Sequence, residues 1–142
     1  ANTPLPRLLW TSSNSGPRSA TTTLRKTITA KQEKIGTFIF DEIDAGISGK
    51  TAWKVSEKLG ILGRTHQIIC ITHLPQIAAM ADHHFYIEKN ATDHSTATTI
   101  TELSEADSLK ELARLSGAAQ LTESVLANAK EMKDLAEKKK QN

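Results

Sequence analysis

The chain has almost no cysteine and no long apolar run. Its 142 residues include one cysteine, Cys70, so no disulfide framework can form within it, which fits a reduced compartment. No apolar stretch approaches the roughly 18 residues that a membrane span needs, and the amino terminus lacks the apolar core of a signal peptide. A net charge of +2 is too small to argue for or against a nucleic-acid partner. We therefore expect a soluble, cytoplasmic protein.

The first 34 residues also lack the apolar periodicity of a helix or strand. The stretch 11–29 is crowded with Ser, Thr, Arg and Lys and contains Gly16-Pro17. Such composition is typical of loops and disordered segments. We expect residues 1–34 to form an atypical, poorly ordered polar segment, and residues 35–142 to form the folded domain.

Two short apolar runs and the segment between them indicate an α/β fold. The runs 35–40 and 67–72 are rich in Ile and Phe, as in strands buried on both faces of a parallel sheet. Between them, residues 51–62 carry apolar side chains at helical spacing, and Gly63 follows as a stop signal. Strand, helix and strand with short loops predict a right-handed βαβ unit with parallel strands.

The remaining chain predicts an edge hairpin and several helices. A short helix is expected over 74–81, followed by strands over 84–89 and 98–103 that form a hairpin at the edge of the sheet. We expect a mostly parallel sheet with flanking helices and a terminal helical pair.

The first helix of that pair is expected to begin at Ser104, which forms a capping box with Asp107, and to end at Gly117. The second carries an apolar stripe of Leu121, Val125, Ala129, Met132 and Ala136. The closing run 138–140, three lysines, suits the negative end of a helix dipole and predicts a frayed, solvated end rather than a DNA contact.

Polar groups that suit nucleoside triphosphate hydrolysis follow the two predicted strands. Asp41 and Glu42 come after the first, and His73 comes after the second. Since ligands of open α/β sheets bind outside the carboxyl ends of the strands, the three side chains are expected to share one pocket. Asp41 would coordinate Mg²⁺, Glu42 would orient or deprotonate water, and His73 would donate to the γ-phosphate of ATP. Each feature alone also occurs at ordinary strand ends. Their combination with the glycine-containing loop 44–49 favours the functional interpretation.

These motifs resemble the ATP-binding-cassette ATPases, and most closely the RecN branch of the SMC-like DNA repair ATPases. The similarity runs from about residue 37 to the carboxyl end. It includes Phe-Asp-Glu-Ile-Asp at 40–44 as a Walker B motif, Ala-Gly-Ile-Ser-Gly at 45–49 as a D-loop, and Thr-His-Leu-Pro-Gln-Ile-Ala at 72–78 as the switch-histidine segment. Segments 111–115 and 122–123 also look like the ending of that family.

The resemblance implies a fold and a function beyond what the residues alone indicate. Such proteins repair DNA double-strand breaks in bacteria, where they are cytoplasmic and associated with the nucleoid. Their head domains form head-to-tail homodimers around two ATP molecules with Mg²⁺, and DNA is bound through the complete protein. The D-loop, here Gly46, Ser48 and Gly49, would lie beside the nucleotide of the partner head.

Two parts of such a head are missing from the sequence. A P-loop needs G-x-x-x-x-G-K-[ST]. The segment 49–51 imitates its end, but Asp44 stands where the first glycine is required, and a carboxylate there would repel phosphate. The chain is therefore predicted to be the carboxyl-terminal lobe of a split head that lacks ATPase activity by itself.

The family signature Ser-Gly-Gly-Glu is also absent, and its expected place reads Ser-Ser-Asn-Ser-Gly-Pro-Arg at 12–18. We hypothesise that residues 8–25 come from a shifted reading frame. Two alternative functions are a transporter ATPase subunit, disfavoured because the D-loop lacks a Leu-Asp ending, and a non-catalytic interaction module that retains the fold.

Overall fold

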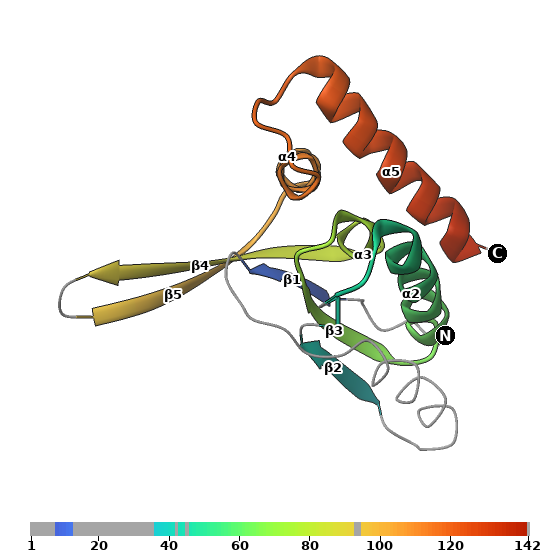
Figure 1. Ribbon diagram of the computed structural model, residues 1–142. Coiled ribbons are helices and arrows are strands. Elements are labelled where there is room, and N and C mark those ends of the chain that lie inside the picture. Colours follow the sequence, from blue (N-terminus) through green and yellow to red (C-terminus); the bar gives the residue numbers. More distant parts are fainter. Residues whose placement is uncertain (1–7, 13–35, 42, 45, 93–94, 142) are drawn as a thin grey trace.

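The structure is a computed structural model and describes residues 8–12, 36–41, 43–44, 46–92 and 95–141. These residues form a mixed α/β fold, in which one five-stranded sheet is covered by helices (Figure 1). The strands follow one another across the sheet in the order β2-β3-β1-β4-β5. The strands are β1 Leu8–Ser12, β2 Thr37–Asp41, β3 Gln67–Thr72, β4 His83–Thr92 and β5 Ser95–Glu102. The helices are α2 Gly49–Leu62, α3 Pro75–Ala78, α4 Glu105–Leu115 and α5 Glu123–Gln141. The predicted α/β class is confirmed.

The strand, helix and strand predicted between residues 35 and 72 are present. Strands β2 and β3 pair in parallel, with Phe40 opposite Cys70. Along β3, the buried residues Ile68, Cys70 and Thr72 alternate with half-buried ones, so one face of the strand points into the core. Helix α2 covers that face with apolar side chains spaced along one side. This packing brings the carboxyl ends of β2 and β3 to the same edge of the sheet.

Strand β1 lies in a segment for which the sequence predicts no regular structure. It pairs in parallel with β3 on one side and with β4 on the other, which places it in the middle of the sheet. The expectation of a poorly ordered segment is therefore wrong for Leu8–Ser12. A run of only three apolar residues, Leu-Leu-Trp at 8–10, is too short to show a period, and backbone pairing with two neighbours decides its conformation. The rest of the 1–34 segment, with most of the proposed frame-shifted stretch, lies outside the described residues.

The predicted hairpin and terminal helices are confirmed. Strands β4 and β5 pair antiparallel at one end of the sheet, and Figure 1 shows the hairpin projecting away from the helices. Helix α4 begins after Ser104, whose hydroxyl accepts a hydrogen bond from the backbone N–H of Asp107. Gly117 follows the helix with a φ of 85°, a conformation that favours glycine.

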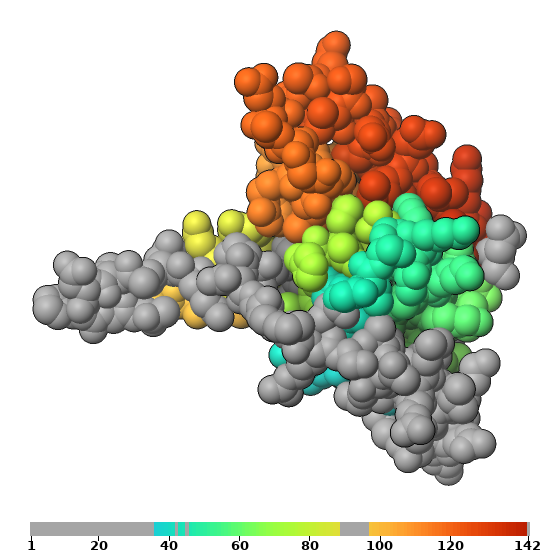
Figure 2. Space-filling model, viewed as in Figure 1, coloured from blue at the N-terminus to red at the C-terminus, as the bar shows by residue number. Residues whose placement is uncertain are grey.

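The last helix closes the core over α2 and α3. Ala129 and Ala136 are buried and Val125 and Met132 pack beside them, so this part of the predicted stripe is confirmed. Leu121 precedes α5 and is 52% exposed, so its assignment to the stripe is wrong. Figure 2 shows α4 and α5 as one continuous mass above α2 and α3.

The carboxyl-terminal lysines are not a frayed end. Lys139 forms an ion pair with Glu57 of α2, and its ammonium lies over the ring of Trp53. Lys140 pairs with Asp82 at 2.9 Å and with Glu137 at 2.5 Å, and its side chain is only 6% exposed. Both ammonium groups therefore hold α5 against the domain, and the predicted fraying is wrong. Within the described residues, no helix is long and apolar enough to cross a membrane.

Candidate functional site

The predicted site residues that follow β2 and β3 lie at one edge of the sheet. Asp41 is the last residue of β2 and stands opposite Ile71 of β3 in the register. His73 comes two residues after Ile71, just beyond the end of β3. The Asp41 residue is exposed, and the His73 side chain is 62% exposed. The structure therefore brings Asp41 and His73 to the same solvent-facing edge, whereas Glu42 lies outside the described residues.

Gly46, Ser48 and Gly49, which are expected to lie beside the nucleotide of the partner head, fall in the loop after β2 and at the start of α2. The backbone N–H of Ile47 donates to the carbonyl of Asp44 at 3.3 Å, and Gly46 has a φ of 76°, so the chain turns sharply here. Ser48 is the N-cap residue of α2, but its hydroxyl lies 3.3 Å from the Thr51 hydroxyl and does not cap the helix. Gly49 is the first residue of α2 and is exposed.

A buried carboxylate connects this loop to His73. Asp44 is only 2% exposed. Its Oδ2 accepts hydrogen bonds from the hydroxyl of Thr72 and from the backbone N–H of His73, the latter at 2.8 Å, and lies 3.1 Å from Nδ1 of the His73 ring. The Thr72 hydroxyl in turn accepts the backbone N–H of Leu74 at 3.0 Å. Asp44 therefore holds the segment after β3 to the loop after β2.

The sequence does not reveal this role of Asp44. It indicates a loop residue, whose carboxylate would only repel phosphate at a false P-loop. One feature of the sequence points to a buried acceptor for this segment: a hydroxyl residue, Thr72, ends the strand directly before His73. The alternation of buried positions along β3 turns Thr72 inward, where its hydroxyl needs a partner.

A second polar side chain lies next to the start of α2. Gln76 Nε2 would be 3.2 Å from a Cβ atom at position 49, so Gly49 allows a close approach between α2 and α3. Among the described residues, two buried side-chain oxygens lack a hydrogen-bond partner, Oδ1 of Asp44 and Oε1 of Gln76. Both belong to this group of side chains, which marks it as the part of the domain with unused hydrogen-bonding capacity.

The exposed carboxylate of Asp41 at this edge suits Mg²⁺. Mg²⁺ is usually held by one or two carboxylates together with substrate phosphates and water. Asp41 can supply one such carboxylate. No group of three or more His, Cys, Asp or Glu side chains among the described residues is arranged as a metal cage. The described residues 46–49 lead into the amino end of α2, whereas the buried carboxylate of Asp44 is directed to Thr72 and His73.

The single cysteine lies directly behind the site. Cys70 is 2% exposed, and burial raises the pKa of its thiol far above the ordinary value, with smaller contributions from the charges of Asp44 and Asp41. Its thiol is therefore a core group and not a nucleophile.

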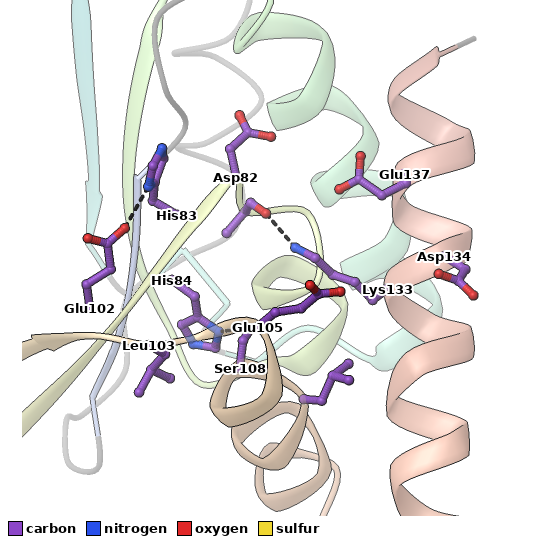
Figure 3. Close-up of a pocket in the computed structure, with 12 residues that line it drawn as sticks. Asp82, His83, His84, Glu102, Leu103, Glu105, Ser108, Lys133, Asp134 and Glu137 are labelled. Carbon is purple, nitrogen blue, oxygen red and sulfur yellow. Dashed lines mark hydrogen bonds and ion pairs between the residues drawn. The ribbon is translucent and has the colours of Figure 1, made fainter.

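A separate polar pocket of about 480 Å³ lies at the start of β4, between α4 and α5 (Figure 3). His83 lies 2.7 Å from Glu102, and Figure 3 shows the two side chains facing each other. Lys133 donates to the carbonyl of Ala81 at 2.6 Å. His84 is buried there with Nδ1 2.8 Å from the Ser108 hydroxyl, and burial lowers the pKa of His84 to about 4. These hydrogen bonds connect β4 to α4, through His84 and Ser108, and the start of β4 to α5, through Ala81 and Lys133. The polar groups of the pocket therefore have a structural role.

The fold and the sheet edge together define the class: a mixed α/β protein with helices packed on a small sheet and polar groups at the ends of two adjacent parallel strands. Known proteins then identify the family. The chain is 49% identical over 108 residues to the DNA repair protein RecN of Haemophilus influenzae, a match that covers 76% of this chain and 19% of that protein. It is 39% identical over 107 residues to RecN of Bacillus subtilis, covering 75% of this chain and 19% of the relative.

The RecN protein of Mycobacterium bovis is 38% identical over 110 residues, which cover 77% of this chain and 18% of the relative. The chain belongs to the RecN family, and it spans about a fifth of the length of these relatives, since the matches cover 18–19% of them. No protein-family model matches the chain.

Proposed function

We propose that this chain is the carboxyl-terminal lobe of the ATPase head of a RecN-type DNA repair protein of the ATP-binding-cassette class. The observation that carries the proposal is the position of Asp41 at the end of β2 and of His73 just beyond the end of the adjacent parallel strand β3. Relatives named DNA repair protein RecN, of which the chain spans about a fifth, support the context of DNA repair.

Each residue at the strand ends has a role in this proposal. Asp41 is a ligand of Mg²⁺, Glu42 orients or deprotonates the attacking water, and His73 contacts the terminal phosphate. Phosphoryl transfer depends mainly on positioning and charge stabilisation, so a few groups at a sheet edge suffice. ATP with Mg²⁺ is the substrate complex that these residues would hold together with the rest of the head.

The loop after β2 belongs to the contact between two heads. Gly46, Ser48 and Gly49 are exposed at the sheet edge and form the D-loop of the proposed head-to-tail homodimer. In that dimer the loop lies beside the nucleotide of the partner head. DNA is bound through the complete protein, and the site of action is the bacterial cytoplasm and nucleoid.

A chimeric protein tests the proposal. Residues 35–142 replace the matching region of the H. influenzae relative, and Mg²⁺-dependent ATP hydrolysis is measured for the chimera and for the isolated chain. We expect turnover from the chimera and none from the isolated chain, because a P-loop is needed to hold the phosphates. Glu42→Gln in the chimera is expected to lower kcat by about 100-fold or more, as the loss of an essential general base does.

The control is His83→Gln in the same chimera, since His83 begins β4 and pairs with Glu102 at the edge of the sheet opposite to Asp41 and His73. It should leave turnover unchanged. A chimera that folds and binds ATP but loses no turnover on Glu42→Gln contradicts the catalytic role. A chimera that folds as a complete head but hydrolyses no ATP would instead favour a non-catalytic interaction module.

A further inference from the structure

The exposed ring of His73 is held from behind by a buried carboxylate. Oδ2 of Asp44 receives the backbone N–H of His73 at 2.8 Å and the hydroxyl of Thr72, and it lies 3.1 Å from Nδ1 of the His73 ring. The Asp44 side chain is 1% exposed, whereas that of His73 is 62% exposed. One end of the imidazole thus faces the protein and the other faces solvent.

The contact at Nδ1 determines which ring nitrogen carries the proton. A carboxylate oxygen only accepts, and a lone pair on Nδ1 would be repelled by it at 3.1 Å, so we expect the proton on Nδ1. The contact made by one imidazole nitrogen sets the protonation of the other. Nε2 is consequently the nitrogen left to meet a ligand.

We propose that Asp44 is the positioning residue of His73: it fixes the ring orientation, keeps the proton on Nδ1 and presents Nε2 at the sheet edge. This rests on the proposed function in one respect, namely that His73 contacts the terminal phosphate. A phosphate oxygen is an acceptor, so the contact requires a proton on Nε2 as well. With phosphate bound, both ring nitrogens would have to be donors, and the Asp44 carboxylate beside Nδ1 would be the counter-charge of that form.

Asp44 also begins the turn that leads into α2. Its backbone carbonyl accepts the N–H of Ile47 at 3.3 Å while its side chain holds His73. A shift of the loop 44–49 therefore moves the ring of His73. In a dimer of heads, this contact couples the loop at the interface to the residue at the terminal phosphate.

Nitrogen NMR of the histidine rings tests the proposal without any nucleotide. The ¹⁵N-labelled chain is studied above about pH 8, where ordinary imidazoles are neutral, and His73 is assigned by comparison with His73→Gln. In the wild-type chain we expect the protonated nitrogen of His73 to be Nδ1, with the downfield, unprotonated resonance at Nε2. A neutral histidine in water favours the opposite tautomer. A wild-type His73 with its proton on Nε2 overturns the proposal, whatever the variants do.

Two variants separate positioning from general loop stability. Asp44→Ala removes the acceptor, so the downfield resonance of His73 is expected to move from Nε2 to Nδ1. Thr72→Val removes another donor to the same oxygen but leaves Nδ1 engaged, so the tautomer should be retained. The pair His83–Glu102 is an internal reference that neither variant should change. Loss of the wild-type tautomer in both variants would contradict a specific role of Asp44.

The chimera described above then separates this inference from the proposed function. Asp44→Ala is expected to lower kcat by roughly 10- to 100-fold with little change in KM, the usual loss when a group that orients a functional histidine is removed. If His73→Ala leaves turnover intact while the tautomer result holds, the proposed role of His73 fails and the positioning by Asp44 stands. If His73→Ala abolishes turnover but Asp44→Ala changes neither kcat nor the tautomer, the positioning role is wrong.

Discussion

Asp44 contacts His73 at two atoms: its Oδ2 accepts the backbone N–H of His73 at 2.8 Å and lies 3.1 Å from Nδ1 of the ring. The two residues come from different loops, one after β2 and one after β3, and are 29 positions apart in the chain. Because Asp44 is buried and His73 is exposed, the pair connects the core of the domain to its solvent-facing edge. Its loss therefore affects both stability and the arrangement of the site.

Asp44→Ala is expected to destabilise the domain by about 3 kcal/mol, because buried donors that lose a charged acceptor keep their desolvation cost. The donors left behind are the Thr72 hydroxyl and the His73 backbone N–H. Urea unfolding followed by circular dichroism measures the change. Asp41→Ala is the matched control, since it removes an exposed carboxylate from the same edge and is expected to cost no more than about 0.5 kcal/mol. Equal losses in both variants would show that burial of Asp44 has no energetic consequence.

Cys70 is expected to be unreactive in the folded chain, because burial, together with the charges of Asp44 and Asp41, raises the pKa of its thiol. Alkylation by iodoacetamide should be slower in buffer than in denaturing urea by at least about 100-fold, since the thiol is exposed only through opening of the structure. Labelling followed by mass spectrometry reports this site alone, as the chain contains one cysteine. Complete labelling of the native chain at the rate seen in urea would contradict the described core.

Much of the fold is predictable from local patterns. Strands β2 and β3 are short apolar runs, α2 and α4 carry apolar faces at helical spacing, and Ser104 marks the start of α4. Strand β1 is not predictable in this way. Its conformation depends on pairing with β3 and β4, which lie more than 55 positions further along the chain, as Leu8 pairs with Ile69 and His83.

The candidate site divides in the same way. Asp41 and His73 are predictable because the carboxyl ends of parallel strands share one edge of a sheet. The role of Asp44 is not, because its partners come from another loop and its own sequence context is that of a turn. Lys139 and Lys140 show the same limit: a basic run at a chain end has the composition of a solvated tail, and only the packing of α5 brings it to Glu57 and Asp82.

Lys140→Gln is expected to destabilise the domain by about 1–2 kcal/mol, because it removes the hydrogen bonds that a nearly buried ammonium donates to the carboxylates of Asp82 and Glu137. The Lys140 side chain is 6% exposed, and it pairs with Asp82 and Glu137. Hydrogen exchange of the amides in the last turn of α5 should also become faster. Lys138→Gln is the control, since Lys138 is an exposed residue of the same run, and its loss should change stability by less than about 0.5 kcal/mol. Indistinguishable effects of the two substitutions would show that the lysine run is solvated after all.

His84 is expected to make the domain less stable as the pH falls from neutral. Burial lowers the pKa of His84 from 6.5 to about 4, with opposing effects of Glu111, which raises it, and Lys133, which lowers it. Below pH 6.5 the unfolded chain takes up a proton on His84 that the folded chain refuses until about pH 4. The free energy of unfolding therefore falls between these pH values, by up to roughly 3 kcal/mol at about 1.4 kcal/mol per pKa unit.

Urea unfolding at several pH values between neutrality and pH 4 measures this dependence, and two neighbouring histidines allow a matched comparison. His84→Gln keeps a polar partner for Ser108 but cannot titrate, so it should flatten the curve over this range. His83→Gln changes the adjacent histidine, whose side chain is 47% exposed and paired with Glu102, and should leave most of the slope in place. The pocket also contains Glu102, Glu105, Asp134 and Glu137, which both variants retain. A slope that survives His84→Gln but disappears in His83→Gln would mean that the exposed pair, and not the buried ring, governs the acid sensitivity of the domain.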